Sequence, residues 1–154
     1  MTHSQLLLAI DQFESGEAAV DFAIGLASVP GARLTVFHVR ELSANIRVLP
    51  LESADEAREV VERSMHRIHD AGIPADGLVC NGREGAVARH ILETAEERWC
   101  TGIVLGSRRL KGIGRLRGGG VRERVMRHSP LPVIVAPPAL TCRRPKWAEA
   151  LTGG

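Results

Sequence analysis

Residues 102–107 read GIVLGS, and residues 131–136 read LPVIVA. Each is a short apolar run, too short for a buried helix but suited to a strand that is covered on both faces. Similar runs occupy residues 5–10 (QLLLAI) and 34–39 (LTVFHV), and a shorter run lies near residues 77–80. These five runs predict five buried strands.

Segments with apolar residues at helical spacing separate these runs. One of them starts at Ser53 and Glu56, whose three-residue spacing has the form of a capping box at a helix N-terminus. Three others are expected at about residues 19–27, 87–99 and 120–128. Strands that alternate with helices predict an α/β fold, with a doubly wound, Rossmann-like parallel sheet of five strands and four helices on its two faces.

Length and composition limit the class of protein. The chain has 154 residues, of which 44% are apolar, 25% charged and 3% aromatic, so we expect one folded domain (1–138) with a C-terminal tail (139–154). No apolar run approaches the roughly 18 residues of a membrane helix, and the N-terminus lacks the pattern of a signal peptide. The three cysteines are widely spaced, which favours a reducing, cytoplasmic location.

The formal net charge of +2 conceals a strong asymmetry. Residues 107–127 contain eight arginines and lysines and one acid, Glu123, a net charge of +7 that leaves −5 for the rest of the chain. The same segment is rich in glycine. A basic, glycine-rich segment on an acidic body indicates an anionic ligand.

Two strand ends carry residues suited to such a ligand. Ligands of doubly wound sheets bind beyond the carboxyl ends of the strands, and Asp11 follows the first strand while Gly106–Gly120 follows the fourth. Glycines let backbone amides approach a phosphate closely, and the next helix adds the positive end of its dipole. Neither the P-loop pattern nor the dinucleotide fingerprint G-x-G-x-x-G is met. The segment therefore predicts a phosphate site of another kind, with Asp11 placed for a sugar hydroxyl, a base or a metal.

The glycine spacing resembles that of the universal stress protein family, over roughly residues 3–137. Nucleotide-binding members of that family carry G-x2-G-x9-G-(S/T) before their last helix and strand. Gly106 and Gly119 match the first and third glycines, whereas Arg109 stands at the second and Gly120 at the hydroxyl position. The resemblance implies an adenine-nucleotide α-hydrolase-like fold that binds ATP or a related nucleotide, with Mg²⁺ as a candidate companion.

The resemblance also implies a set of site residues, with the base near the first two strands and Asp11 near base or ribose. The nucleotide-binding set is Ala9, Asp11, Val39, Gly106, Arg109, Gly119, Gly120 and Val121, and Ser107 and Arg115 are further phosphate contacts. Family members commonly form a homodimer through the last strand, here Leu131–Ala136. The implied role is regulatory, in the stress response, with at most slow ATP hydrolysis.

Several alternatives stay open at this stage. Arg109 either contacts phosphate or fills the groove, so a dimeric interaction module without nucleotide is the second hypothesis. An enzyme of the wider fold group would carry S-G-G-x-D-S or H-I-G-H-like motifs, which are absent, and a nucleic-acid site would pair the basic segment with aromatic residues, which it lacks. Arg122, Arg124 and Arg127 fit a solvated helix face, and His38 fits the edge of the core.

Overall fold

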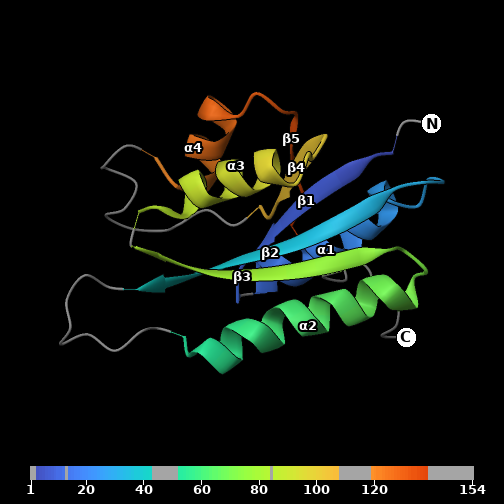
Figure 1. Ribbon diagram of the computed structural model, residues 1–154, viewed down its shortest axis with the longest axis horizontal. Helices are drawn as coiled ribbons and strands as arrows, with labels where there is room; N and C mark the ends of the chain where they lie inside the picture. The colour runs from blue at the N-terminus through green and yellow to red at the C-terminus, as the bar shows by residue number, and fades with distance from the viewer. Residues whose placement is uncertain (1–2, 13, 43–51, 84, 108–118, 139–154) are drawn as a thin grey trace, which may run out of the picture.

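The computed structural model describes residues 3–12, 14–42, 52–83, 85–107 and 119–138 (Figure 1). The elements follow one another as β1 (Gln5–Ile10), α1 (Glu14–Leu26), β2 (Arg33–Leu42), α2 (Ala54–Asp70), β3 (Ala75–Arg83), α3 (Val87–Glu97), β4 (Gly102–Leu105), α4 (Val121–His128) and β5 (Val133–Val135). This order confirms the predicted α/β fold with five strands and four helices. The predicted tail, 139–154, lies outside the described residues, so the predicted domain boundary stays a prediction.

All strand pairs are parallel, and the sheet order is β3-β2-β1-β4-β5. The chain therefore moves outward from β1 in one direction through β2 and β3, and in the other direction through β4 and β5. β1 and β4 are neighbours at the point where this direction reverses, which is where ligands bind in doubly wound sheets.

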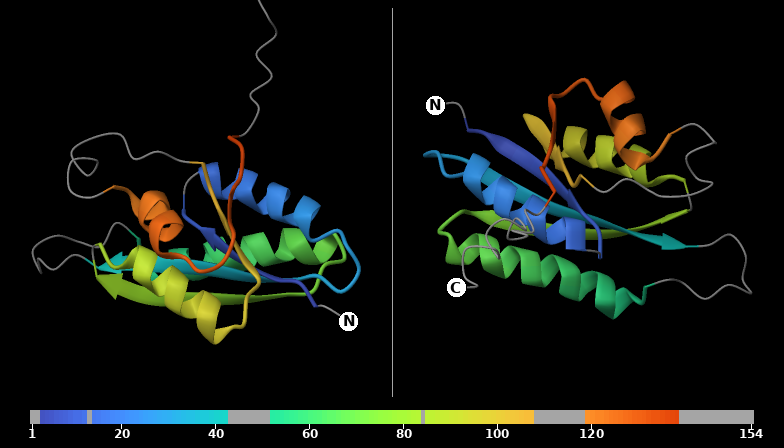
Figure 2. Two further views of the ribbon diagram at one scale, coloured as in Figure 1. Left: turned by 90° about the horizontal axis from the view of Figure 1, so that it is seen from above. Right: turned by 180° about the vertical axis from the view of Figure 1, so that it is seen from behind.

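Two apolar clusters fill the two faces of the sheet. One joins α1 and α2 to residues such as Leu8, Leu34 and Val36, and the other joins α3 and α4 to Leu7 and Ile103. Both views in Figure 2 show α3 and α4 side by side. Consecutive strand residues point to opposite faces, so strands covered on both sides need apolar residues at every position. None of the helices in the described ranges is both long and apolar enough to cross a membrane.

The strand ends differ from the sequence-based expectation at three places. β2 continues to Leu42 and β3 spans Ala75–Arg83, because the two strands stay paired in register as far as Leu42 and Arg83. Their last residues include polar ones, which the backbone hydrogen bonds of the ladder hold in place without burial. β5 is shorter than predicted, at Val133–Val135.

The predicted start of α2 is confirmed in atomic detail. The Ser53 amide donates to Glu56 Oε2 at 2.6 Å, and the Glu56 amide donates to Ser53 Oγ at 3.1 Å. Hydrogen bonds to the Glu56 carboxyl from the Ser53 amide and, secondarily, from the Ser53 side chain lower the pKa of this carboxyl. The capping box fixes where α2 begins, and so fixes the residue just before it, Glu52.

The packing of α2 on β3 depends on the absence of a side chain at Gly77. A Cβ atom built there would lie 2.4 Å from Met65 Sδ and 2.5 Å from Val61 Cγ1. We expect Gly77→Ala to lower the free energy of unfolding by about 1–3 kcal/mol, because the helix must shift or Val61 must leave its rotamer. Urea denaturation measures this change.

The matched control is Gly25→Ala near the end of α1, where a Cβ atom would have no neighbour within 4 Å. We expect this substitution to raise the free energy of unfolding by about 0.5–1 kcal/mol, since alanine is the better helix former. Equal effects of the two substitutions would contradict the close packing at Gly77.

Candidate functional site

Three of the predicted residues lie in or just after neighbouring strands: Val39 in β2, Asp11 after β1 and Ser107 after β4. Ala9 of β1 is paired with both Phe37 and Leu105. Asp11 directly follows Ile10, which is paired with His38, and Ser107 follows Leu105 by two residues, so continued registers would set Val39, Asp11 and Ser107 in one row. The row lies at the carboxyl edge of the sheet, at the β1–β4 reversal, and Gly106 directly precedes Ser107 in it.

Val39 contributes to this row through its backbone. Its side chain is 8% exposed and belongs to the apolar cluster beneath α3. A Cβ atom built on Gly82 of β3 would lie 2.7 Å from Val39 Cγ1, so the neighbouring strand also approaches it closely. The polar groups of Val39 are therefore its backbone N–H and C=O, which lie within β2, three residues before the strand ends.

The start of α4 presents backbone amides, as an anion site requires. Gly119 has φ +84°, a conformation that favours glycine, and Gly120 is the N-cap, followed by Val121 as the first helical residue. Gly120 has no side chain to bond the free amides of the first turn. These amides and the helix dipole favour a negative group at this position.

Arg122 links the start of α4 to the end of β4. Its NH1 donates to the Ser107 carbonyl at 3.5 Å, its NH2 donates to Glu123 Oε1 at 3.0 Å, and its side chain is only 20% exposed. Arg124 NH1 donates at 3.0 Å to the carbonyl of Gly85, which precedes α3 in the sequence. The expected solvated helix face is therefore found only for Arg127, which is exposed. The spacing of the arginines gave no signal for these contacts.

The carboxylate of Glu123 is a negative group that the chain itself places at the start of α4. Hydrogen bonds from its own backbone amide lower the pKa of its carboxyl, and bonds from Arg122 and the Gly120 amide act in the same direction. Glu123 stands three residues after the N-cap, the spacing of the acidic half of a capping box. That spacing was visible in the sequence, where Glu123 is the single acid of the basic segment. A phosphate at this helix start would compete with Glu123 for the amides.

A buried polar pair adjoins the row at the ends of β1 and β2. His38 Nδ1 is 2.9 Å from the Ile10 carbonyl oxygen, and His38 Nε2 is 2.7 Å from Glu52 Oε2. His38 is 4% exposed and Glu52 is 5% exposed, so both lie inside the protein. Sequence reasoning placed His38 at the core edge and did not single out Glu52, because nothing local links residues 14 positions apart.

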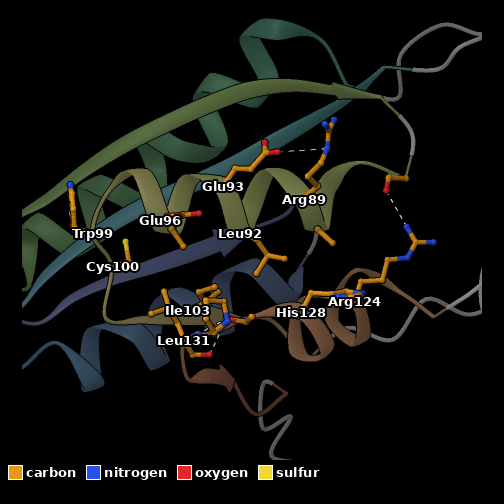
Figure 3. A pocket seen from close by; sticks show the side chains of 15 residues that line it. Arg89, Leu92, Glu93, Glu96, Trp99, Cys100, Ile103, Arg124, His128 and Leu131 are labelled. Atoms are coloured by element: carbon orange, nitrogen blue, oxygen red, sulfur yellow. Dashed lines mark hydrogen bonds and ion pairs between the residues drawn. The ribbon is translucent and has the colours of Figure 1, made fainter.

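A separate groove lies between α3 and α4 and has a volume of about 690 Å³ (Figure 3). Leu92, Ile103 and Leu131 are among its apolar lining residues. Arg124 lies at one end and Trp99, which is 88% exposed, at the other. Those predicted nucleotide-binding residues that the structure describes do not line this groove.

The structure thus brings together two groups of predicted residues. The first group has Ala9 in β1, Val39 in β2, Asp11 after β1, and Gly106 and Ser107 after β4, and the second has Gly119, Gly120 and Val121 at the start of α4. Arg122 connects the groups through its bond to Ser107. Arg109 and Arg115 lie outside the described residues, so their phosphate contacts stay predictions.

Comparison with known proteins identifies relatives over most of the chain. A family model for the universal stress protein family matches residues 3–137. The universal stress protein YxiE of Bacillus subtilis (strain 168) is 29% identical over 147 residues, which cover 86% of this chain and 97% of YxiE.

Two solved structures share the fold. A universal stress protein from Burkholderia pseudomallei has a TM-score of 0.69 and 26% identity, and the match covers 89% of this chain and 97% of that one. A universal stress protein from Archaeoglobus fulgidus, solved in complex with dAMP, has a TM-score of 0.65 and 22% identity, with 89% and 100% covered.

The hydrogen bonds of Glu123 predict a pH-dependent contribution to stability. A carboxyl whose pKa is lower in the folded state stabilises the fold above the ordinary value of 4.5 and loses that contribution as the pH falls through the folded-state pKa. We expect Glu123→Gln to lower the free energy of unfolding at pH 7 by about 0.5 kcal/mol or less, since the side chain is largely exposed. The deficit should close by pH 3 in urea denaturation.

The control for this measurement is Glu62→Gln on the exposed face of α2. A deficit of Glu123→Gln that persists unchanged at pH 3 would show that its charge does not stabilise α4.

Proposed function

Because this chain belongs to the universal stress protein family, we propose that it is a regulatory protein of the stress response that binds ATP or a related adenine nucleotide. The observation that carries the proposal is that Asp11 and Ser107 follow the paired strands β1 and β4 at one edge of the sheet, and that Arg122 bonds Ser107 from the start of α4. The dAMP complex of the Archaeoglobus fulgidus relative supports an adenine ligand for this fold.

In the proposed complex, base and ribose lie on the β1–β2 side and the phosphates on the β4–α4 side. Asp11 accepts a hydrogen bond from ribose or base, and the amides of Gly106 and of residues 119–121 bind phosphate oxygens. Arg109 and Arg115 add cationic donors from the segment between β4 and α4. Mg²⁺ binds proteins chiefly through phosphates and one or two carboxylates, and Asp11 is the carboxylate expected at this edge.

We propose a cytoplasmic protein with at most slow ATP hydrolysis. Cys80 and Cys100 are free thiols, which suits a reducing compartment. Burial is the main cause that raises the pKa of the Cys100 thiol, to about 11, so this cysteine is a poor nucleophile at neutral pH. Cys100 therefore serves the packing of the apolar core rather than catalysis, which fits a binding protein.

The nucleotide site can be tested with three single substitutions. We expect Asp11→Ala and Arg109→Ala each to weaken ATP binding by about tenfold, because each removes a hydrogen-bonding or charged partner of the ligand. Arg127→Ala removes an exposed arginine of the same charge and should leave the affinity unchanged within twofold. Equilibrium dialysis with labelled ATP and Mg²⁺ measures all three.

Two results of this experiment would contradict the proposal. One is the absence of ATP binding by the wild-type protein at millimolar nucleotide. The other is an unchanged affinity in both Asp11→Ala and Arg109→Ala, which would place the ligand elsewhere.

The second candidate function, a dimeric interaction module, is favoured by the position of β5 as the edge strand among the described residues. Val133–Val135 is the last strand of the sheet, and its side chains are only half-buried. The Ala136 amide donates to the Leu105 carbonyl and the Pro132 carbonyl accepts from the Ile103 amide, so these even-numbered residues face β4. By the alternation of a strand, the amides of Val133 and Val135 point toward the open edge.

This geometry allows a substitution that tests the edge alone. Val135→Pro removes an outward amide and leaves the β4–β5 hydrogen bonds intact, so we expect it to weaken a homodimer formed through β5. Val135→Ala keeps the amide and is the matched control. Sedimentation equilibrium at several concentrations measures the dimer, and a wild-type protein that stays monomeric would contradict this interface.

A further inference from the structure

Trp99 is a large aromatic residue that contributes little to the packing of its own chain. Its side chain is 88% exposed, more than any other large apolar side chain that the structure describes. Its φ is +53°, and no other non-glycine residue in the described ranges has a positive φ. This left-handed conformation strains a bulky residue, and glycine is the usual residue at such a position after a helix. Exposure and strain together indicate that Trp99 has a role outside the stability of the folded chain.

The charges of α3 oppose the dipole of the helix. Acidic side chains favour the first turn of a helix and basic ones the last, but α3 has no acid in its first turn and no base in its last. Instead, Arg89 lies in the first turn and Glu96 in the last, and both are exposed. The ion pair of Arg89 Nε with Glu93 Oε1 is long, at 4.0 Å, and joins exposed side chains, so it stabilises the helix little. This arrangement of charges does not serve the stability of α3.

Trp99 and these charges belong to one stripe that runs along α3 and borders the α3–α4 groove (Figure 3). Its residues follow one another at intervals of three, four and three, the spacing of one helix face. The four residues, all of which line the groove, are Arg89, Leu92, Glu96 and Trp99. Arg124 of α4 lies at the Arg89 end. One end of the groove is thus cationic, whereas the other is acidic and aromatic.

The two ends of this groove complement each other. An arginine pairs with a carboxylate, and it is also attracted to the face of an indole ring. Within one chain, two turns of helix, about 10 Å, separate Arg89 from Glu96. A second copy of the chain, turned end to end, brings the cationic end of one groove against the acidic and aromatic end of the other. The surface is therefore complementary to itself.

We propose that the α3–α4 groove is an interface between two copies of this chain, in which each copy places its Trp99 at the Arg124 end of the other copy's groove. A two-fold axis across the middle of α3 sets the two α3 helices antiparallel. Arg89 of each copy then pairs with Glu96 of the other, and the apolar floor of each groove is covered. This inference goes beyond the proposed nucleotide function and uses a surface that contains no residue of β5.

Burial of Trp99 on association can be measured directly. The chain has two tryptophans, so Trp147→Phe leaves Trp99 as the single one. Indole emission moves to shorter wavelength when the ring leaves water. We expect the emission of Trp99 to shift in this direction as the protein concentration rises from about 1 µM to about 1 mM, in step with the dimer fraction from sedimentation equilibrium.

Exchanging the charges tests the antiparallel arrangement. Arg89→Glu and Glu96→Arg each set like charges against each other in a homodimer, so each variant should self-associate at least about tenfold more weakly. An equimolar mixture restores both opposite-charge pairs, and it should form a heterodimer more tightly than either variant forms a homodimer. Each substitution agrees with the helix dipole, and circular dichroism checks that both variants fold.

Trp99→Gly removes the anchor and the strain together. We expect it to weaken the dimer at least about tenfold, while the urea midpoint, measured where the protein is monomeric, stays unchanged or rises. Val135→Pro is the control, because it alters the outer edge of β5 and should leave the shift of Trp99 emission unchanged.

Each part of this experiment has an outcome that would overturn the interface. One is an emission of Trp99 that does not change up to about 1 mM, and a dimer found by sedimentation in that case would belong to β5. Another is a mixture of the two charge variants that associates no more tightly than either alone. An undiminished dimer in Trp99→Gly would have the same meaning, and so would a fall of its urea midpoint, because Trp99 would then serve the fold.

Discussion

The parallel pairing of β1 with β4 is the constraint on which the rest of the molecule depends. Because β1 is central and β4 lies beside it, the chain leaves β1 toward one side of the sheet and returns to the other. The two segments that follow these strands then start from adjacent points of one edge, without a helix between them. Ala9 and Leu105, 96 residues apart in the sequence, are paired, so the residues that follow β1 and β4 leave the sheet at the same edge.

The charges of the site are already partly balanced within the folded chain. The Glu123 carboxyl accepts hydrogen bonds from its own amide and from the Gly120 amide. Arg122 is bonded both to Glu123 and to the Ser107 carbonyl after β4. An anionic ligand would therefore have to displace the Glu123 carboxylate from the amides at the start of α4. Under the proposed function, such a displacement would couple ligand binding to the position of Glu123.

The fold was predictable because its core strands are covered on both faces. Leu7, Leu8, Ile103 and Val104 are fully buried, and strands of this kind appear in a sequence as continuous apolar runs. The ends of β2 and β3 were not predictable, since Arg40–Leu42 and Asn81–Arg83 are held by each other's backbone rather than by burial. The positions of the predicted residues near the strand ends and at the start of α4 follow from the order of the elements. The side-chain contacts of Arg122 and Glu52 could not be predicted from that order.

The sequence by itself determined the elements, their alternation and the glycine-rich basic segment after the fourth strand, because hydrophobic periodicity, capping and glycine spacing are local properties of the chain. Only the tertiary structure decided which strand ends meet, that His38 is buried against Glu52, and that one oxygen of this carboxylate is left without a donor. These contacts join residues distant in the chain, and such pairings arise from the order of the strands in the sheet, which no local pattern encodes.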